Sequence, residues 1–166
     1  MDERRRRFEA QALPHLDAAY NLARWLARSP ADAEDIVQDA MLRAFRAFDG
    51  FRGGDAKPWL LAIVRNCCRN MHADTRRRAH TSLPEDDANA IAGSDADPEF
   101  EAVRASESRN LNAAIALLPD EFREVLILRE MEEMSYREVA EATGTPIGTV
   151  MSRLSRARAM LKEKLR

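Results

Sequence analysis

The chain has 166 residues, of which 33% are charged, and its formal net charge is −2. That length suits one medium-sized domain or two small ones, and the near-neutral total argues against nucleic-acid binding over the whole surface. No apolar run reaches the roughly 18 residues that a membrane-spanning helix needs, and no apolar segment follows the basic N-terminus, so neither membrane insertion nor secretion is expected.

The composition predicts the fold class. Ala, Leu, Arg and Glu are abundant, whereas Val, Ile and aromatic residues are sparse. The abundant residues are strong helix formers, so we expect an all-α fold. The two cysteines, Cys67 and Cys68, are adjacent and are not expected to pair with each other, which is typical of a cytoplasmic protein.

The first helix is predicted between Phe8 and Arg28, because apolar residues recur there at helical spacing. Pro14 would break this helix or delay its start, so the ordered part is expected to begin near that residue. The run from Arg4 to Arg7 could contact DNA, but we expect a disordered charged tail.

A second helix is predicted after Ser29 and Pro30, because the serine can cap it and the proline suits its first position. Its inner face is apolar and continues to Phe48. The outer face carries Asp32, Asp35, Gln38 and Asp39. These acids complement the positive end of the helix, and the last three also form a candidate docking face for a basic partner.

Residues 49–56 form a predicted loop with three glycines. Phe51 and Arg52 stand within it. An aromatic ring and a guanidinium in a pliable loop can stack on an unpaired base or grip it. Phe51 could equally fold back into the core.

The longest helix is predicted from Lys57 to about Ala79, with one strongly apolar face. Its other face carries polar and basic side chains, including Arg65, Asn66, Arg69 and Asn70. Five arginines against one aspartate between positions 65 and 80 exceed what the helix dipole needs, so we favour a nucleic-acid face. Cys68 and His72 lie one turn apart, but two ligands make a poor metal site, and no metal or other cofactor is expected.

Residues 81–103 contain seven acids and no Lys or Arg, with Pro84, Gly93 and Pro98 interrupting them. This composition is typical of a flexible acidic linker. We therefore predict two small helical domains, residues 1–80 and 99–166, joined by a linker over 81–98.

The C-terminal part contains a predicted helix-turn-helix. Ser135 and Glu138 form a capping box, Gly144 suits a left-handed helix end, and Pro146 prevents continuation. A second helix then starts near Ile147. One of its faces is apolar and the other carries hydroxyls and guanidiniums, as in a helix that reads a DNA major groove. An ordinary helical hairpin with solvated arginines is the alternative.

These segments, in this order, resemble a known family. Residues 32–45, the Phe51 loop and residues 59–66 resemble region 2 of the extracytoplasmic-function (ECF) group of bacterial sigma factors, within the sigma-70 family. Residues 118–125, 135–140 and 148–158 resemble region 4 of the same group. The resemblance covers nearly the whole chain except the linker. It implies a three-helix region-2 domain and a helix-turn-helix region-4 domain.

The resemblance also implies a function: a promoter-specificity subunit that binds the RNA polymerase core and helps to melt promoter DNA. The residues that would dock on the clamp of the largest polymerase subunit are Asp32, Asp35, Gln38 and Asp39. Those that would meet the −10 element are Phe51, Arg52, Arg65, Asn66, Arg69 and Asn70. Those that would meet the −35 element are Thr149, Met151, Ser152, Arg153, Ser155 and Arg156.

Further expectations follow from the resemblance. An anti-sigma factor is expected as a partner, the free chain is expected to be a monomer that binds promoter DNA poorly, and no ligand-binding domain is expected after Arg166. Met151 stands where a basic residue is common, which puts one base contact in doubt. The alternative function is a self-sufficient dimeric helix-turn-helix repressor or activator. An enzyme is not expected, because no nucleophile–base pair or phosphate-binding loop is present in the sequence.

Overall fold

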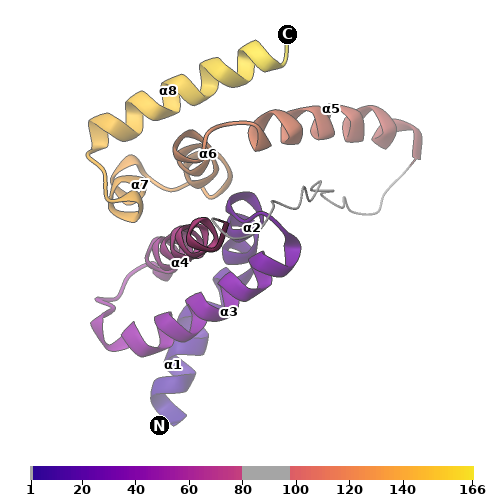
Figure 1. The fold of residues 1–166 in the computed structure, drawn as a ribbon. Coiled ribbons are helices and arrows are strands. Elements are labelled where there is room, and N and C mark those ends of the chain that lie inside the picture. The colour runs from indigo at the N-terminus through magenta and orange to yellow at the C-terminus, as the bar shows by residue number, and fades with distance from the viewer. Residues whose placement is uncertain (1, 80–97) are drawn as a thin grey trace.

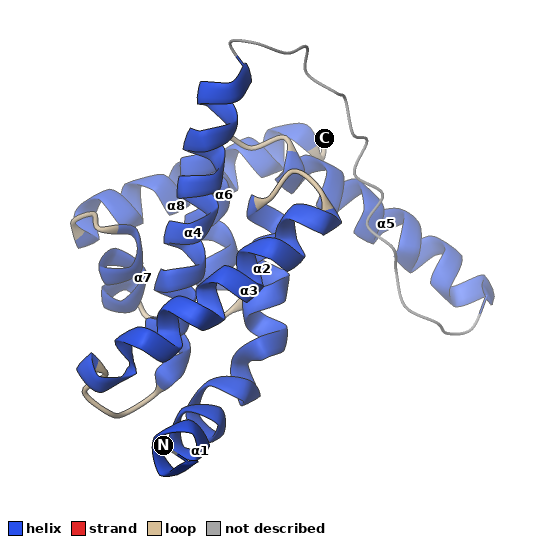
Figure 2. Ribbon diagram, turned by 60° about the horizontal axis from the view of Figure 1, so that its bottom comes forward, coloured by secondary structure: helices blue, strands red, loops and turns tan. Residues whose placement is uncertain are grey.

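The computed structural model describes residues 2–79 and 98–166 (Figure 1). Every regular element within these ranges is helical, so the predicted all-α fold is confirmed for the part of the chain that is described (Figure 2). None of the described helices is both long enough and apolar enough to cross a membrane. The expected linker over 81–98 falls almost entirely outside the described residues.

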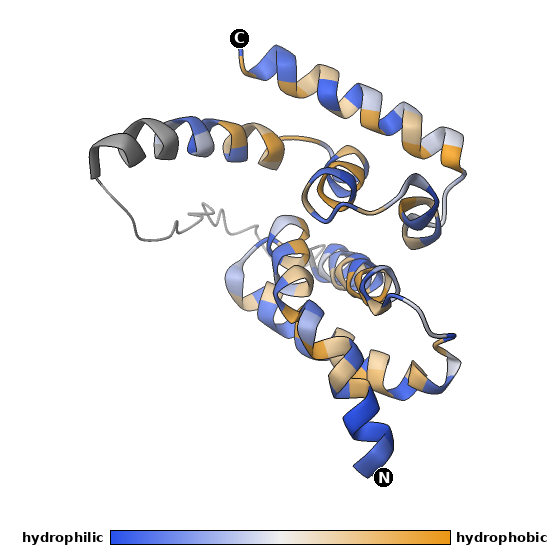
Figure 3. Ribbon diagram, turned by 180° about the vertical axis from the view of Figure 1, so that it is seen from behind, coloured by the Kyte–Doolittle hydropathy of each residue, from blue (hydrophilic) through white to orange (hydrophobic). Residues whose placement is uncertain are grey.

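The N-terminal segment differs from the prediction. It forms two helices, α1 (Asp2–Ala12) and α2 (Leu16–Leu26), joined by the 3-10 turn η1 (Leu13–His15). Pro14 lies within this turn because it cannot donate the hydrogen bond that a continuous helix would need. The predicted disordered tail from Arg4 to Arg7 is wrong, since these residues form a strongly hydrophilic helical segment (Figure 3).

Helices α3 (Pro30–Ala47) and α4 (Ala56–Ala79) complete this first helical group, with the short turn η2 (Phe48–Gly50) after α3. The predicted N-cap of α3 is confirmed, because the Asp32 amide donates to Ser29 Oγ at 3.1 Å. Helix α4 packs against both α2 and α3. The core between them is aliphatic, with Leu22, Ile36 and Leu60 essentially inaccessible to solvent.

The second helical group begins with α5 (Pro98–Ala116), whose N-terminal end projects away from the rest (Figures 1 and 2). Then follow α6 (Asp120–Leu126), a π-helical turn η3 (Ile127–Met131), α7 (Tyr136–Thr143) and α8 (Ile147–Lys164). Helix α8 packs on α6 and α7. The core of this group contains Leu118, Phe122, Leu126, Val139, Val150 and Leu154, all of which are buried. Ile147, the first residue of α8, is 42% exposed and lies outside this core.

The two helical groups contact each other directly. Helix α7 lies against α4, and α6 lies against α2 (Figure 1). The sequence alone does not predict whether the two parts pack together. In this structure they do, and α4, the helix of the predicted −10 face, is partly covered by α7.

Candidate nucleic-acid and polymerase interfaces

The helix-turn-helix has the predicted local geometry. The Ser135 amide donates to Glu138 Oε1 at 2.8 Å, and the Glu138 amide donates to Ser135 Oγ at 3.1 Å, which is a complete capping box. Gly144 ends α7 with φ of 66°, and Pro146 immediately precedes α8. The predicted turn is therefore confirmed, and it sets the angle between α7 and α8.

Helix α8 separates its two faces cleanly. Val150, Leu154 and Ala157 are buried against α6 and α7. Of the six predicted −35 residues, four are exposed and two are half-buried; the exposed ones are Met151, Ser152, Ser155 and Arg156, and the half-buried ones are Thr149 and Arg153. A polar helical face left free in this way can enter a DNA major groove.

Phe51 lies within an aromatic cluster. Its ring centroid is 5.0 Å from that of Trp59 and 6.0 Å from that of Phe48, onto which it stacks. Phe51 is half-buried, whereas its neighbour Arg52 is exposed. Phe51 therefore packs against core rings while part of its side chain stays accessible to solvent, and its stacking on a base stays a prediction.

Only part of the predicted −10 face of α4 is exposed. Asn66, Arg69 and Asn70 are exposed, as expected. Arg65 is only 6% exposed, so its expected place on an open face is wrong for this conformation. Its Nε and Nη2 atoms donate to the two carboxylate oxygens of Glu124 at 2.9 and 3.0 Å. No local sequence pattern predicts this pair, because the partners are 59 residues apart.

A cleft of about 600 Å³ lies where the two helical groups meet. Its lining brings Arg65, Arg69 and Asn70 of the predicted −10 face close to Arg153 of the predicted −35 face. Arg153 Nη2 stands 3.7 Å from a carboxylate oxygen of Glu121 on α6. Residues expected to contact two separate DNA elements thus line one cleft in this structure.

The predicted polymerase-docking residues lie on α3. Asp35, Gln38 and Asp39 are exposed, and Asp39 pairs with Arg43 one turn later at 3.1 Å. Asp32 is half-buried in the first turn, where a carboxylate complements the helix dipole.

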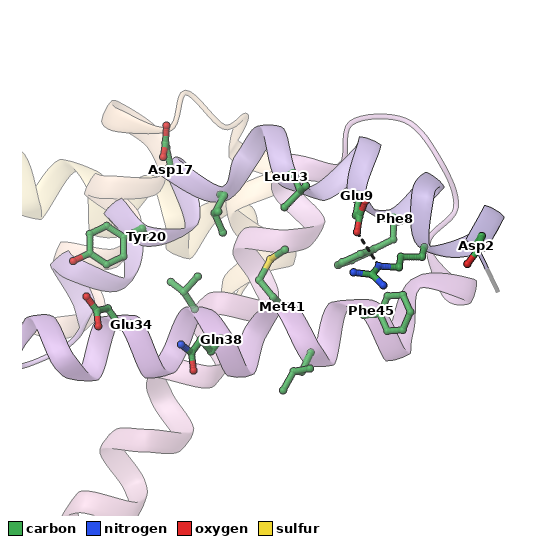
Figure 4. A pocket seen from close by; sticks show the side chains of 14 residues that line it. Asp2, Phe8, Glu9, Leu13, Asp17, Tyr20, Glu34, Gln38, Met41 and Phe45 are labelled. Carbon is green, nitrogen blue, oxygen red and sulfur yellow. Dashed lines mark hydrogen bonds and ion pairs between the residues drawn. The ribbon is translucent and has the colours of Figure 1, made fainter.

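Sequence reasoning missed an apolar groove beside these residues. The groove, about 1050 Å³, runs between α3 on one side and α1, η1 and α2 on the other (Figure 4). Its apolar lining includes exposed Leu13, Leu16 and Leu42 and half-buried Met41, and Gln38 lies on its wall. Acidic side chains of Asp2, Glu9, Asp17 and Glu34 also line it, together with Arg5, which pairs with Glu9 at 3.0 Å. The helical break at Pro14, which shapes one wall, was the signal available in the sequence.

The remaining chemistry is sparse. Cys67 and Cys68 are free thiols buried in the core. Burial raises the pKa of Cys68 to about 12 and that of Cys67 to about 11, with the Asp39 carboxylate adding to the second shift. Among the described residues, no group of three potential ligands could hold a metal ion.

Comparison with known families identifies the class. The family model of Sigma-70 region 2 matches residues 13–78, and that of Sigma-70 region 4 matches residues 108–161. These ranges contain the partly exposed α4 face and the helix-turn-helix. The chain therefore has the two-region architecture of a sigma factor, a regulatory subunit of RNA polymerase.

The similar curated proteins narrow the class. The chain is 36% identical over 87% of its length to an ECF RNA polymerase sigma-E factor of Haemophilus influenzae, covering 79% of that protein. It is 34% identical over 91% of its length to the ECF RNA polymerase sigma factor SigE of Mycolicibacterium smegmatis, of which it spans 58%. The chain belongs to the ECF sigma factors.

Two solved structures are similar across the whole chain. The sigma factor RpoE, in complex with the anti-sigma factor NepR from Bartonella quintana, has a TM-score of 0.74 at 30% identity, covering 95% of this chain and 96% of that one. CnrH, in complex with the cytosolic domain of CnrY, has a TM-score of 0.67 at 26% identity, covering 97% and 88%. The similarity spans both helical groups.

Proposed function

We propose that this chain binds the RNA polymerase core, directs it to promoters through −35 and −10 contacts, and helps to melt the DNA. The observation that carries this proposal is α8, where Met151, Ser152, Ser155 and Arg156 are exposed on a helix whose opposite face is packed into a confirmed helix-turn-helix. Membership of the ECF sigma factors supplies the polymerase as the partner of this DNA-reading helix.

At the −35 element, the roles follow from side-chain chemistry. Arg156 is exposed and can bind a guanine edge or a phosphate. Ser152 and Ser155 can pair with several base edges. Met151, 53% exposed, offers an apolar contact of the kind a thymine methyl accepts.

At the −10 element, Phe51 and the α4 face take the corresponding roles. A flipped base that stacks on an accessible aromatic ring gains about 1–3 kcal/mol, which offsets part of the cost of unstacking. Phe51 is half-buried, so part of its side chain is accessible to a base. Its neighbour Arg52 is exposed, as are Asn66, Arg69 and Asn70 on α4. Arg65 can join them only when it is released from Glu124.

For the polymerase core, the groove and the acidic face of α3 act together. An apolar groove with carboxylates along it fits an amphipathic helix that carries basic flanks. Asp35, Gln38 and Asp39 extend the same surface along α3. We assign the clamp of the largest polymerase subunit to this surface.

Transcription in vitro tests the proposal. The chain, added to sigma-free core polymerase and genomic promoter fragments, should start transcription at a subset of promoters. Arg156→Ala should lower initiation about tenfold or more, since a good arginine–base contact is worth about 1–3 kcal/mol. Arg28→Ala, which removes an exposed charge between α2 and α3, is the matched control. Tight binding of a palindromic site as a dimer, without any initiation by core, would instead establish the helix-turn-helix repressor or activator.

We further propose control by an anti-sigma factor. Two structurally similar proteins were each solved with a partner: the sigma factor RpoE with the anti-sigma factor NepR, and CnrH with the cytosolic domain of CnrY. Co-expression of the chain with candidate small proteins from neighbouring genes, followed by co-purification and loss of transcription in vitro, tests this partner.

A further inference from the structure

We propose that Arg7 of α1 binds a phosphate of the single DNA strand that passes over Phe51, and that α1 thereby extends the −10 surface. Helix α1 lies before residues 13–78, which the region-2 family model matches. The proposal rests on the function proposed above for the stacking of a base on Phe51. The phosphate contact itself does not depend on that stacking.

The arginines of α1 differ in whether their charge is already paired. Two of them form ion pairs with carboxylates at 3.0 Å: Arg4 with Asp49, and Arg5 with Glu9. Arg6 and Arg7 are exposed, and among the described residues no carboxylate pairs with either of them. The positive charges of Arg6 and Arg7 are therefore available to an external anion.

The two sides of α1 carry different groups. The side that lines the apolar groove carries Asp2, Arg5 and Glu9 (Figure 4). Arg7 does not line the groove. It follows Arg4 by three residues, and residues with this spacing are neighbours on a helix surface. Arg7 therefore lies on the side of α1 that contacts the end of α3 and the turn η2, away from the surface assigned to the polymerase.

Phe48 of η2 connects Arg7 to the Phe51 loop. The guanidinium carbon of Arg7 lies 6.0 Å from the centroid of the Phe48 ring, which is the outer limit of a cation–π contact. Such a contact is weak, so it places the guanidinium without occupying its donors. Phe51 stacks on the same Phe48 ring, with centroids 6.0 Å apart. Phe51 thus has one exposed guanidinium beside it in the chain, that of Arg52, and a second across a single ring.

This arrangement suits a single strand of DNA. Proteins that bind single strands place aromatic rings under the bases and positive charge along the backbone. Each stacked nucleotide has a phosphate on both its 5′ and its 3′ side, so one ring needs more than one cation near it. A guanidinium binds phosphate oxygens with two parallel donors. Arg7 and Arg52 supply two such groups close to the Phe51 ring.

The salt dependence of single-strand binding tests the phosphate contact. The probe is a fluorescein-labelled thymine homopolymer of about 12 nucleotides, titrated with the free full-length chain and followed by anisotropy. Arg7→Ala should lower the affinity at low salt about fivefold. It should also reduce the slope of log affinity against log salt by about 0.7, the value for one phosphate on a single strand.

Arg6→Ala is the matched control for this measurement. It removes the same charge from an exposed position of the same helix, and among the described residues Arg6 has no contact with the aromatic cluster. Its salt slope should equal that of the wild type. Equal slopes for Arg7→Ala and Arg6→Ala would overturn the proposal, as would the absence of measurable binding by the wild type at low salt.

Arg7→Lys separates a phosphate contact from a structural role. Lysine keeps the positive charge that binds a phosphate but lacks the planar group that stacks on Phe48. The lysine variant should therefore retain the salt slope of the wild type. Hydrogen exchange in α1 should be the same in the wild type and in Arg7→Ala, because Arg4 and Phe8 still hold the helix. A lysine variant that loses as much of the slope as Arg7→Ala would overturn the proposal, since Arg7 would then only support the aromatic cluster.

Phe51→Ala tests the function on which the proposal rests. This variant removes the stacking ring but no charge, so it should lower the affinity for the strand and leave the salt slope unchanged. Unchanged affinity in Phe51→Ala would refute the stacking of a base on Phe51. The reduced slope of Arg7→Ala would still establish the phosphate contact, so the two failures are distinguishable.

Discussion

Arg4 in α1 holds the end of α3 through Phe45. Its Nη2 atom donates to the Phe45 carbonyl oxygen at 2.6 Å, and the guanidinium carbon lies 4.5 Å from the centroid of the Phe45 ring. Its Nε atom also pairs with Asp49 at 3.0 Å. One arginine thus fixes the N-terminal helix to the C-terminal end of α3 and to the turn that follows it.

This contact predicts how α1 responds to mutation. Arg4→Ala should release α1, since hydrogen bonds from charged donors are worth about 1.5–3 kcal/mol. Hydrogen exchange should accelerate in α1 and much less in α4, because α1 can open locally. Arg6→Ala, on an exposed position of the same helix, is the control and should exchange like the wild type. Protection of α1 that survives Arg4→Ala would show that Phe8 and Ala12 alone hold the helix.

Replacing two glycines of the helix-turn-helix by alanine should change the free energy of unfolding in opposite directions. Gly144 has φ of 66°, and an added Cβ would meet nothing within 4 Å, so Gly144→Ala should cost about 1–2 kcal/mol from backbone strain alone. Gly148 lies in α8, also with open space, and Gly148→Ala should stabilise by about 0.5–1 kcal/mol. Urea denaturation measures both. Destabilisation by both substitutions would point to steric contacts rather than conformation.

The capping box predicts that mutation of Ser135 lowers the stability of the fold by a small amount. Ser135→Ala removes the acceptor for the Glu138 amide and should cost about 1 kcal/mol. Ser135→Asp retains an acceptor at the N-cap and should restore most of the loss. The midpoint of urea denaturation is the measurement. Equal loss in both variants would mean that the hydroxyl contributes through another contact.

The groove predicts a defect in polymerase binding without a defect in folding. Leu42 is 57% exposed within it, so Leu42→Arg should weaken association with core at least tenfold, as expected for a central apolar contact, while leaving stability unchanged. Leu117→Arg is the control, because Leu117 is 70% exposed and lies between α5 and α6, outside the groove. Co-purification with core polymerase should then separate the two variants.

The buried thiols predict that both cysteines react slowly with alkylating reagents and that the stability of the fold depends on pH. Their pKa values, about 11 and 12, lie above the ordinary value of 9.0, so the native protein should resist iodoacetamide near neutral pH and react only when unfolded. Because the folded state disfavours the thiolate, this stabilisation is complete below pH 9.0 and is lost as the pH rises through 11 and 12. A Cys67→Ala/Cys68→Ala variant should lose less stability over that range.

Local signals predicted the local structure well. The caps at Ser29 and Ser135 and the left-handed Gly144 were all readable, because each depends on a few adjacent residues. The ordered position of Arg4 could not be predicted from the sequence, because its partners Phe45 and Asp49 lie more than forty positions away. A run of four arginines is typical of disorder, and only tertiary contacts overrule that pattern.

The candidate interfaces likewise include features that local sequence predicts and features that it does not. The free face of α8 follows from helical periodicity, so its exposed residues were predicted correctly as exposed. The burial of Arg65 depends on Glu124, and the groove depends on the angle between α2 and α3, neither of which periodicity specifies. Both features arise where distant segments meet.

Because the guanidinium at position 65 and the carboxylate at position 124 are both buried, replacing either one alone leaves an unpaired buried charge. A substitution at one of these positions is therefore tolerated best when the other position changes with it. Covariation between these two positions among related sequences would record that constraint.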